Sequence, residues 1–501
     1  MNKKILIPSA IAVFIIVITA VAMTSFFYLY DDQSQISDTN ITTSSMISTV
    51  TKDIVVSHTM SISNASSPAL AINPNTGSMH LAYAQSQNNM TNLYMTTSSD
   101  LKSFSPPVKV NDVDVDPDQG TVMPIRFGPD GEMYVVWNHP GEHPDFWGGI
   151  MNLRSTKSMD YGHTFEPSID PASALPKSEK LYPELEVTKE GVLLMPYVNN
   201  DLVFLDGGGV TYNTQTIDYV TQTPIMRSDD GGKTFQQIMM DAQSCQCCPI
   251  STTTGPDGEV YVVWRTSDKQ YTSPVSSSDK YSNYYSSQEE WIEGLSESER
   301  KAYEEGLIAP PTEYTTARDM LFSHTTDGGI GLEWTEPIRI QDAKWNYKGC
   351  PSLGAGMAFD DNGRLYIAYY TGAGEDGKIG FYYVYSDDRG KTFSKPIALF
   401  SADFVALNHH KIQVAVDKND NVWFSFIMLN DPTVTEKSWA LLNPERVIHI
   451  FAYDKTGNLI DKQEFNIGSS HALPTMVYFN DKMLLGYADH DGLELVSMQL
   501  T

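Results

Sequence analysis

Three stretches of the chain share one pattern: Ser158-Met-Asp160-Tyr-Gly162-His-Thr164-Phe165, Ser228-Asp-Asp230-Gly-Gly232-Lys-Thr234-Phe235 and Ser386-Asp-Asp388-Arg-Gly390-Lys-Thr392-Phe393. Each reads Ser-x-Asp-x-Gly-x-Thr-Phe. The pattern predicts a hairpin turn in which the Asp accepts backbone N–H bonds, the Gly adopts a positive φ, and the aromatic ring holds the turn against the core. Thr325-Thr-Asp327-Gly-Gly329 is a variant, and Ser98-Ser-Asp100 begins a degenerate copy.

A second repeat, with a period of about sixty residues, runs between these turns. Each copy has a Pro, a short apolar strand, a turn rich in Gly, Asp or Asn, and a strand dense in aromatic and β-branched residues. The copies begin at Pro68, Pro124, Pro183, Pro249, Pro351, Ile412 and Pro474, with Ile412 in place of the missing Pro.

The turns are Asp-box repeats, and residues 54–501 resemble the sialidase-like β-propellers. The resemblance implies an all-β fold, a single propeller of four-stranded blades. Seven inner-strand copies predict seven blades, and six is the alternative if one copy is spurious, because typical sialidases have six. Residues 54–62 are expected to complete the last blade, which ends with the strand Leu493–Leu500, and so to close the ring. An insertion at 269–313 falls in the fourth blade, with helical spacing in Gln288–Leu307.

The N-terminal residues predict where the chain is located. Lys3 and Lys4 precede an uncharged stretch, Ile5–Tyr30, long enough to span a bilayer. The positive flank predicts a transmembrane signal-anchor over 1–30 with everything after it outside the cytoplasm. A cleaved signal peptide is the alternative, because Ala20-Val21-Ala22 suits a cleavage site. Residues 31–53 are read as a solvated Ser/Thr-rich stalk, so the sequence predicts a single-pass cell-membrane protein with an extracytoplasmic body.

The composition narrows the classes of partner. The chain has 62 acidic and 34 basic residues and a net charge of −28. Nucleic-acid binding is therefore not expected, because a phosphate-binding face needs a basic excess. The membrane, through the N-terminal helix, and cell-surface glycans are the expected partners.

The repeat also predicts which residues surround the central mouth. In an up-and-down blade, the start of the innermost strand and the end of the second strand emerge on one face, and the Asp-box turns lie on the other. All four cysteines and two histidines hold mouth positions, just before the inner strands: Cys245, Cys247, Cys248, Cys350, His410 and His471.

Three interpretations of the cysteines stay open. The first is two disulfides, natural outside the cytoplasm. The second is a Cys/His site for copper, or less distinctively zinc. The third is inert thiols, and the first two can coexist if two cysteines pair and two ligate. Cys248 and Cys350 are expected to lie close enough for a disulfide or a shared ion. The acidic run from Asp112 to Asp118 favours a solvated loop, with calcium as the alternative.

The resemblance implies a possible hydrolytic site at the same mouth. Sialidases use three arginines to clamp a substrate carboxylate, a Tyr nucleophile and an Asp acid/base. The candidates in this chain are Arg265, Arg318, Arg446, Tyr370 and Asp268. The Arg-Ile-Pro that normally opens the first inner strand is missing, because Ser66-Ser67-Pro68 stands there.

We therefore expect an extracytoplasmic, membrane-anchored propeller that recognises or processes a glycan-type ligand at its mouth. If it is an enzyme, it is expected to be a sialidase-like glycoside hydrolase, with weak or no turnover of sialosides. The alternatives are a non-hydrolytic copper- or zinc-binding surface protein and a surface scaffold.

Overall fold

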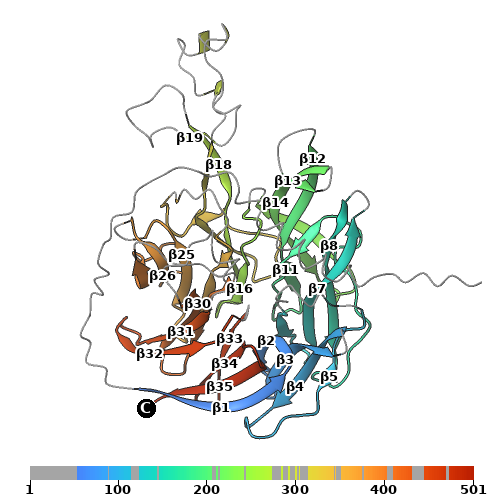
Figure 1. Cartoon of the computed structure of the whole chain (residues 1–501), viewed down its shortest axis with the longest axis vertical. Coiled ribbons are helices and arrows are strands. Elements are labelled where there is room, and N and C mark those ends of the chain that lie inside the picture. Colours follow the sequence, from blue (N-terminus) through green and yellow to red (C-terminus); the bar gives the residue numbers. More distant parts are fainter. Residues whose placement is uncertain are drawn as a thin grey trace, which may run out of the picture.

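Small antiparallel sheets follow one another along the chain, one for each copy of the inner-strand repeat. The computed structural model describes residues 53–87, 90–113, 115, 123–143, 146–205, 210–212, 215–241, 244–272, 284–285, 292–293, 300–301, 304, 314–343, 345, 351–374, 377–402, 410–430, 445–469 and 473–501. The sheets are arranged as a seven-bladed, all-β propeller (Figure 1). The prediction of seven blades is confirmed, and the alternative of six is wrong.

The first four blades are numbered from the first repeat, with strands given from the inside outwards. Blade one is β2 (Ala65–Ile72), β3 (Met79–Gln87), β4 (Met90–Ser98) and β5 (Val108–Lys109). Blade two is β6 (Ile125–Phe127), β7 (Met133–His143) and β8 (Phe146–Ser158). Blade three is β10 (Glu186–Val187), β11 (Leu193–Pro196), β14 (Gln215–Ser228) and β15 (Gln236–Asp241). Blade four is β16 (Ser251–Thr254), β17 (Val260–Arg265), β21 (Met320–His324) and β22 (Ile338–Arg339).

The remaining three blades follow the same plan. Blade five is β24 (Gly356–Phe359), β25 (Leu365–Thr371), β26 (Ile379–Ser386) and β27 (Ile397–Ala402). Blade six is β29 (Gln413–Val416), β30 (Val422–Leu429), β31 (Arg446–Tyr453) and β32 (Leu459–Asn466). Blade seven is β33 (Thr475–Phe479), β34 (Lys482–Ala488), β35 (Gly492–Leu500) and β1 (Ile54–Ser63). A short parallel pair, β23 (Leu353–Gly354) with β28 (His410–Lys411), links blades five and six.

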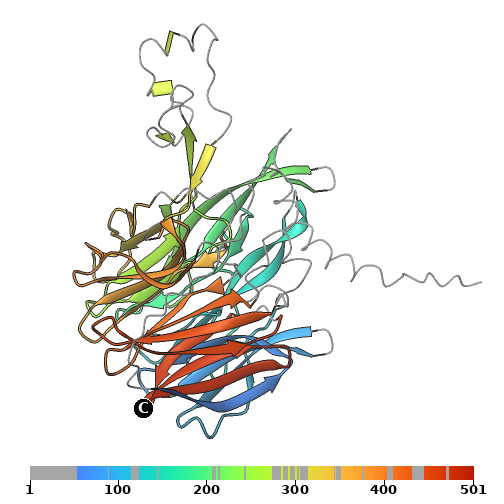
Figure 2. The ribbon, with the colours of Figure 1, turned by 60° about the vertical axis from the view of Figure 1, so that its left-hand side comes forward.

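The ring closes through its first and last strands. β1 pairs antiparallel with β35, from Ile54 opposite Leu500 to Ser63 opposite Gly492. In Figures 1 and 2 the blue strand β1 lies beside the red strands of blade seven. Inner strands of neighbouring blades are in contact all the way round, including β2 with β33. The prediction that residues 54–62 complete the last blade is confirmed.

The hydrophobic core lies between the blades. Each pair of neighbouring blades shares an apolar layer, as where Trp423 and Ile448 of blade six pack with Met483 and Leu485 of blade seven. The second strands are covered on both sides, and every residue of β17 is buried. This explains their composition, because a strand covered on both faces needs apolar residues at consecutive positions rather than at alternate ones.

The three turns have the geometry that their sequence predicts. Asp160 accepts the Thr164 N–H at 2.8 Å, Asp230 accepts that of Thr234 at 2.9 Å, and Asp388 accepts that of Thr392 at 2.8 Å. The glycines of these turns have φ values of 88°, 81° and 81°. The aromatic rings pack onto the layers between blades. The sequence of each turn therefore fixes both its conformation and its position on the ring.

Two extensions project beyond the ring (Figure 2). In blade three, β12 (Val198–Leu205) pairs with the long strand β14 and with β9 (Glu179–Leu181), and β13 (Val210–Tyr212) pairs with β14. In blade four, β18 (Asp268–Thr272) pairs with β19 (Tyr284–Tyr285) and β20 (Tyr314–Ala317). Both leave the ring just after a second strand, on the face where the mouth is expected. Most of Gln288–Leu307, predicted to be helical, lies outside the described residues.

The predicted anchor, signal peptide and stalk also lie outside the described residues, which begin at 53. Within the described part of the chain, no helix is both long and apolar enough to cross a membrane.

Candidate functional site

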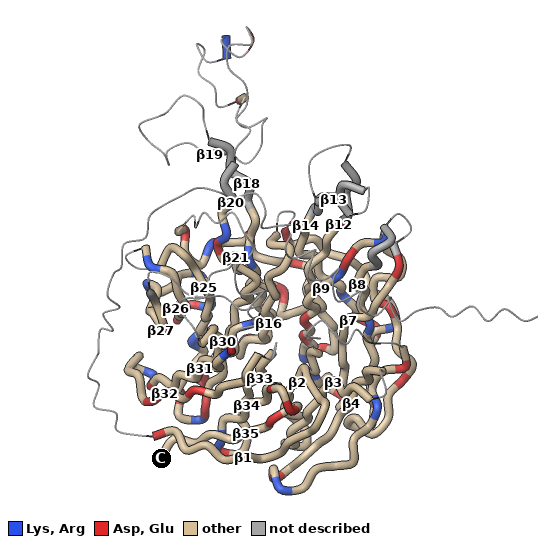
Figure 3. The backbone as a smooth tube through the Cα atoms, viewed as in Figure 1, with Lys and Arg blue, Asp and Glu red and all other residues tan. Residues whose placement is uncertain are grey.

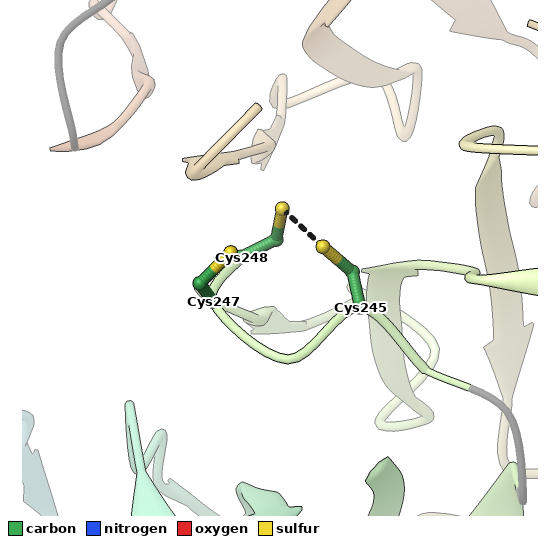
Figure 4. A group of neighbouring side chains, drawn as sticks. All are labelled: Cys245, Cys247 and Cys248. Carbon is green, nitrogen blue, oxygen red and sulfur yellow. Dashed lines mark hydrogen bonds between the residues drawn. The ribbon is translucent and has the colours of Figure 1, made fainter. Parts of the chain in front are cut away.

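Three cysteines lie together on the loop that leads from β15 to the inner strand β16 (Figure 4). The loop is held against the end of β17, because the Cys245 N–H donates to the Arg265 carbonyl at 2.8 Å. Cys245 and Cys248 are 1% and 2% exposed, and their Sγ atoms are 2.8 Å apart. The Sγ atoms of Cys245, Cys247 and Cys248 all lie within 4.8 Å of one another. A compact cluster of sulfur atoms therefore lies beside the mouth.

The three cysteines are not in the same chemical state. Cys245 and Cys248 are reduced thiols, whereas Cys247 is disulfide-bonded and half-buried. The expected disulfide between Cys248 and Cys350 is wrong, and so is the interpretation of two disulfides, because Cys245 and Cys248 are free thiols and Cys247 is disulfide-bonded. The alternative, an ion shared by Cys248 and Cys350, stays a prediction. Cys350 itself lies outside the described residues. In Figure 4 the Cys245 and Cys248 sulfurs face each other across the loop, and the Cys247 sulfur lies near them.

The pair Cys245–Cys248 is electrostatically asymmetric. Burial opposes ionisation of Cys245, but the hydrogen bond with Cys248 and the charges of Arg318 and Arg265 outweigh it, so the Cys245 pKa lies below the ordinary thiol value. Burial raises the pKa of Cys248, and the hydrogen bond and negative charge of Cys245 raise it further. The pair thus gives up one proton readily and holds the other, as expected of interacting thiols beside cations.

The buried side chains of Arg265 and Arg446 stabilise the fold by hydrogen bonds to the backbone. The guanidinium of Arg265, 1% exposed, donates to the carbonyls of Arg318 at 2.6 Å, Tyr370 at 2.8 Å and Leu353 at 3.4 Å. Arg446 is fully buried and donates to the Ser469 carbonyl at 2.6 Å. A clamp for a substrate carboxylate needs guanidinium N–H groups that face the ligand. These two side chains instead face backbone carbonyl groups.

Arg318 has a different environment. It is half-buried, and within the described part of the chain its Nε has no hydrogen-bond acceptor. It borders a polar hollow of about 10 Å³, whose lining includes Asp319, Gln341 and Thr371. A volume of this size holds about one water molecule. The hollow can therefore offer polar groups to a ligand in the mouth but cannot enclose a sugar ring.

The other predicted site residues are placed as follows. Tyr370 is buried in β25, with its ring edge-on to Trp345 and Phe381. Asp268 begins β18 and His410 begins β28, and their side chains lie outside the described part of the structure, as does the whole of His471. Asp112 accepts a hydrogen bond from the Ser168 N–H at 2.9 Å, and most of the acidic run after it is also outside the described residues.

Two further residues belong to the mouth and were missed from the sequence. Burial raises the pKa of Tyr182, and the neighbouring groups Cys248, Glu179 and Cys245 raise it further. Burial also raises the pKa of Glu179, which accepts a bond from Asn200 at 2.9 Å. The signal for Tyr182 was present, because it directly precedes Pro183, just as Cys248 precedes Pro249. No comparable sequence signal marked Glu179, because β9 belongs to the extension rather than to the repeat.

Ion pairs join inner-strand positions of different blades. Lys411 bonds to Glu184, so blade six is tied to blade three. Glu186 accepts bonds from Arg126 at 2.8 Å and from Thr252 and Thr254 at 3.0 Å. These charges are therefore paired with each other. Elsewhere, acidic and basic residues are both scattered around the ring (Figure 3).

Comparison with known proteins gives structural similarity only. No protein-family model matches the chain. No curated protein matches it in sequence. Among solved structures, a protein of unknown function from Dyadobacter fermentans is 15% identical, with a TM-score of 0.40, over 89% of this chain and 97% of that one. A PL25 ulvan lyase is 10% identical, with a TM-score of 0.46, over 88% and 94%. A variant of the NanB sialidase from Streptococcus pneumoniae is 9% identical, with a TM-score of 0.42, over 89% and 95%. These values are too low to transfer an activity to this chain.

Proposed function

We propose that this protein binds a soft metal ion, Cu(I), at the mouth of its propeller through the thiolates of Cys245 and Cys248. The observation that carries the proposal is the approach of two buried, reduced cysteine sulfurs to 2.8 Å. Thiolates are the ligands that select Cu(I) among the common protein metals. Zn(II) also accepts thiolates but completes a tetrahedron, which would need two further ligands.

The distance between the sulfurs is compatible with a shared ion after a small movement. Two thiolates on opposite sides of a two-coordinate ion, with metal–sulfur bonds of about 2.3 Å, would lie roughly 4.6 Å apart. The sulfurs of Cys245 and Cys248 would therefore separate by nearly two ångströms from 2.8 Å. Rotation about the Cα–Cβ bonds on a loop is sufficient for such a change.

The charges around the pair favour an anionic complex. Two thiolates with one Cu(I) carry a net charge of −1, and a buried charge needs a partner. Arg318 and Arg265 both act on the two thiols as positive charges. The Nε atoms of both arginines have no acceptor within the described residues, and a thiolate sulfur or a water molecule could accept from them.

Metal analysis of the purified full chain tests the proposal. Reduced protein loaded with Cu(I) and then freed of excess metal should retain about one copper per chain. Cys245→Ser and Cys248→Ser should each abolish retention, and loading of the wild type should fall at low pH because protons compete for sulfur. Cys247→Ser is the matched control and should keep the metal. Equal retention by wild type, Cys245→Ser and Cys248→Ser would refute the site.

The proposed location is outside the cytoplasm, with residues 1–30 as a membrane anchor. The apolar stretch after Lys3 and Lys4 supports the anchor. The disulfide at Cys247 supports an oxidising compartment. The full chain should sediment with membranes and a chain starting at residue 31 should not. Protease added to intact cells should cleave the anchored body, and a body protected from that protease would contradict the location.

Glycan recognition at the mouth is the second candidate. It is favoured by the hollow beside Arg318, where a guanidinium, a carboxylate and an amide lie next to one another. Such groups bind sugar carboxylates and hydroxyls. Arg318→Ala should weaken retention on immobilised acidic oligosaccharides, whereas Cys248→Ser, which removes a proposed metal ligand, should not. Robust hydrolysis of a fluorogenic sialoside, lost in Arg318→Ala, would favour this candidate as an enzyme.

A further inference from the structure

Cys245 and Cys248 are separated by two residues, a Cys-x-x-Cys spacing that also occurs in redox-active dithiols. Here the pair lies against a third sulfur that is already oxidised. The Cys247 Sγ is within 4.8 Å of both thiol sulfurs, and its own disulfide is intact. A dithiol and a disulfide are thus held side by side on one short loop.

Burial separates the roles of the three sulfurs. Cys245 and Cys248 are almost fully enclosed, so a dissolved thiol or disulfide cannot line up with their sulfurs. Cys247 is half-buried and is the member of the cluster that solvent can reach. Thiol–disulfide exchange requires direct contact between sulfurs, so exchange with external thiols or disulfides would occur at Cys247.

We infer that Cys245, Cys247 and Cys248 form a thiol–disulfide exchange relay, in which the buried pair stores two electrons and the Cys247 disulfide passes them to an external disulfide. This activity goes beyond metal binding and needs no metal. The external substrate is a low-molecular-weight disulfide or an exposed disulfide of another protein.

The steps balance without any other reactant. A thiolate of the pair attacks the Cys247 sulfur, forms a mixed disulfide with it and releases the former partner sulfur as a thiolate. The second thiolate of the pair then attacks the mixed disulfide, forms the Cys245–Cys248 disulfide and releases Cys247. Two electrons have moved from the pair to the Cys247 disulfide, and two protons follow to the released sulfurs. An external disulfide then oxidises these sulfurs again and is itself reduced to two thiols.

The two thiol sulfurs already lie close to the positions that the Cys245–Cys248 disulfide requires. A disulfide needs its sulfurs about 2.05 Å apart, and those of Cys245 and Cys248 are already at 2.8 Å. The loop can therefore reach the oxidised state by a movement of less than an ångström.

Time-resolved alkylation with peptide mapping tests the relay. The full chain, with a copper chelator present, is mixed with oxidised glutathione, and thiols are trapped at intervals. The relay predicts that the Cys245–Cys248 disulfide forms while a labelled Cys247 thiol, or its glutathione adduct, appears transiently. In Cys247→Ser, oxidation of the pair should slow by about tenfold or more, because the accessible sulfur is gone.

Two outcomes would overturn the relay. One is oxidation of the pair at the same rate in wild type and Cys247→Ser, with no Cys247 thiol ever trapped. The other is a pair that stays reduced in the wild type throughout. If Cys247→Ser does not fold, the trapping result in the wild type decides alone. Because copper is chelated, the result is independent of whether the metal site exists.

Discussion

On the turn face of the ring, three hairpins close with the same hydrogen bonds, whereas on the mouth face equivalent positions hold unrelated side chains. Asp160, Asp230 and Asp388 each accept from the side chain of a Thr four residues later, at 2.6–2.7 Å. Directly before the Pro of the inner-strand repeat, by contrast, stand Ser67 in blade one, Tyr182 in blade three and Cys248 in blade four.

Two of these mouth positions share an unusual backbone conformation. Ser67 and Tyr182 are both left-handed, with φ of 51° and 50°, whereas Cys248 does not have a positive φ. A left-handed conformation is costly for a non-glycine residue and persists only where the surroundings impose it. The comparison therefore teaches that one face repeats its residues in order to fix the ring, while the other varies its side chains from blade to blade.

The largest effect on stability is expected from deletion of β1, the strand that closes the ring. Deletion of residues 53–63 removes β1, leaves β35 as an open edge and uncovers the apolar layer around Ile54. The free energy of unfolding should fall by about 5 kcal/mol or more, comparable with the stability of a whole domain. Denaturant unfolding of the chain from residue 31, with and without this strand, measures the difference. A deletion variant that unfolds like the parent would mean that the ring is stable while open.

Arg265 tests whether a mouth residue can belong to the scaffold. Arg265→Met should lower the free energy of unfolding by about 4 kcal/mol, because the buried carbonyls that it bonds lose their donor. Arg318→Met, the control at the same mouth, should cost less than about 1 kcal/mol. The two variants are compared by urea unfolding. If the two variants lose the same free energy of unfolding, Arg265 stabilises the scaffold no more than Arg318 does.

Substitution of a glycine on the turn face tests how tightly that face is packed. Gly390 has φ of 81°, and an added Cβ would lie 2.2 Å from the ring of buried Phe322. Gly390→Ala should therefore cost about 3 kcal/mol, from backbone strain and overpacking together. Gly77→Ala has a similar φ of 67° but nothing within 4 Å, so it should cost about 1 kcal/mol. Thermal unfolding of both variants separates the steric part from the conformational part.

The smallest effect is a pH dependence on the turn face. His80 contacts the Tyr161 carbonyl of the first turn at 3.2 Å, and burial holds its pKa below the ordinary value. The unfolded chain therefore binds a proton at a higher pH than the folded chain. Stability is complete above the unfolded pKa of about 6.5 and declines as the pH falls below it, by at most about 1.4 kcal/mol per pH unit.

Unfolding experiments between pH 7.5 and 5 should show this slope in the wild type. His80→Gln should reduce it, and His490→Gln, at an exposed position, should not. A slope unchanged in His80→Gln would assign the pH dependence to another group.

Much of the scaffold could be predicted from the sequence because its signals are local and repeated. The Ser-x-Asp-x-Gly-x-Thr-Phe turns specify their own hydrogen bonds, and the unpaired strand at 54–62 implied its partner once the blades were counted. The sequence also predicted that Cys245, Cys247 and Cys248 lie beside the inner strand of blade four, because they directly precede its repeat Pro.

The finer chemistry of the mouth could not be predicted in this way. Which sulfur of Cys245, Cys247 and Cys248 forms a disulfide depends on side-chain directions within one loop, and spacing does not determine these. The burial of Arg265 against backbone carbonyls was equally hidden, because the carbonyl groups of Tyr370 and Leu353 come from another blade. Motif spacing locates a residue on a face, but its partners are set by packing across blades.

The pairing of β1 with β35 has a consequence for the order of events during synthesis. The chain's first described strand and its last are partners, and the Thr501 N–H donates to the Asp53 carbonyl across a separation of 448 residues. At about 5–20 residues per second, β1 waits roughly 20–90 s for its partner to be made. During that time it is an unpaired edge with Val55 and Val56 at its surface, a template for association with other nascent chains. The ring therefore cannot close before β35 has been synthesised.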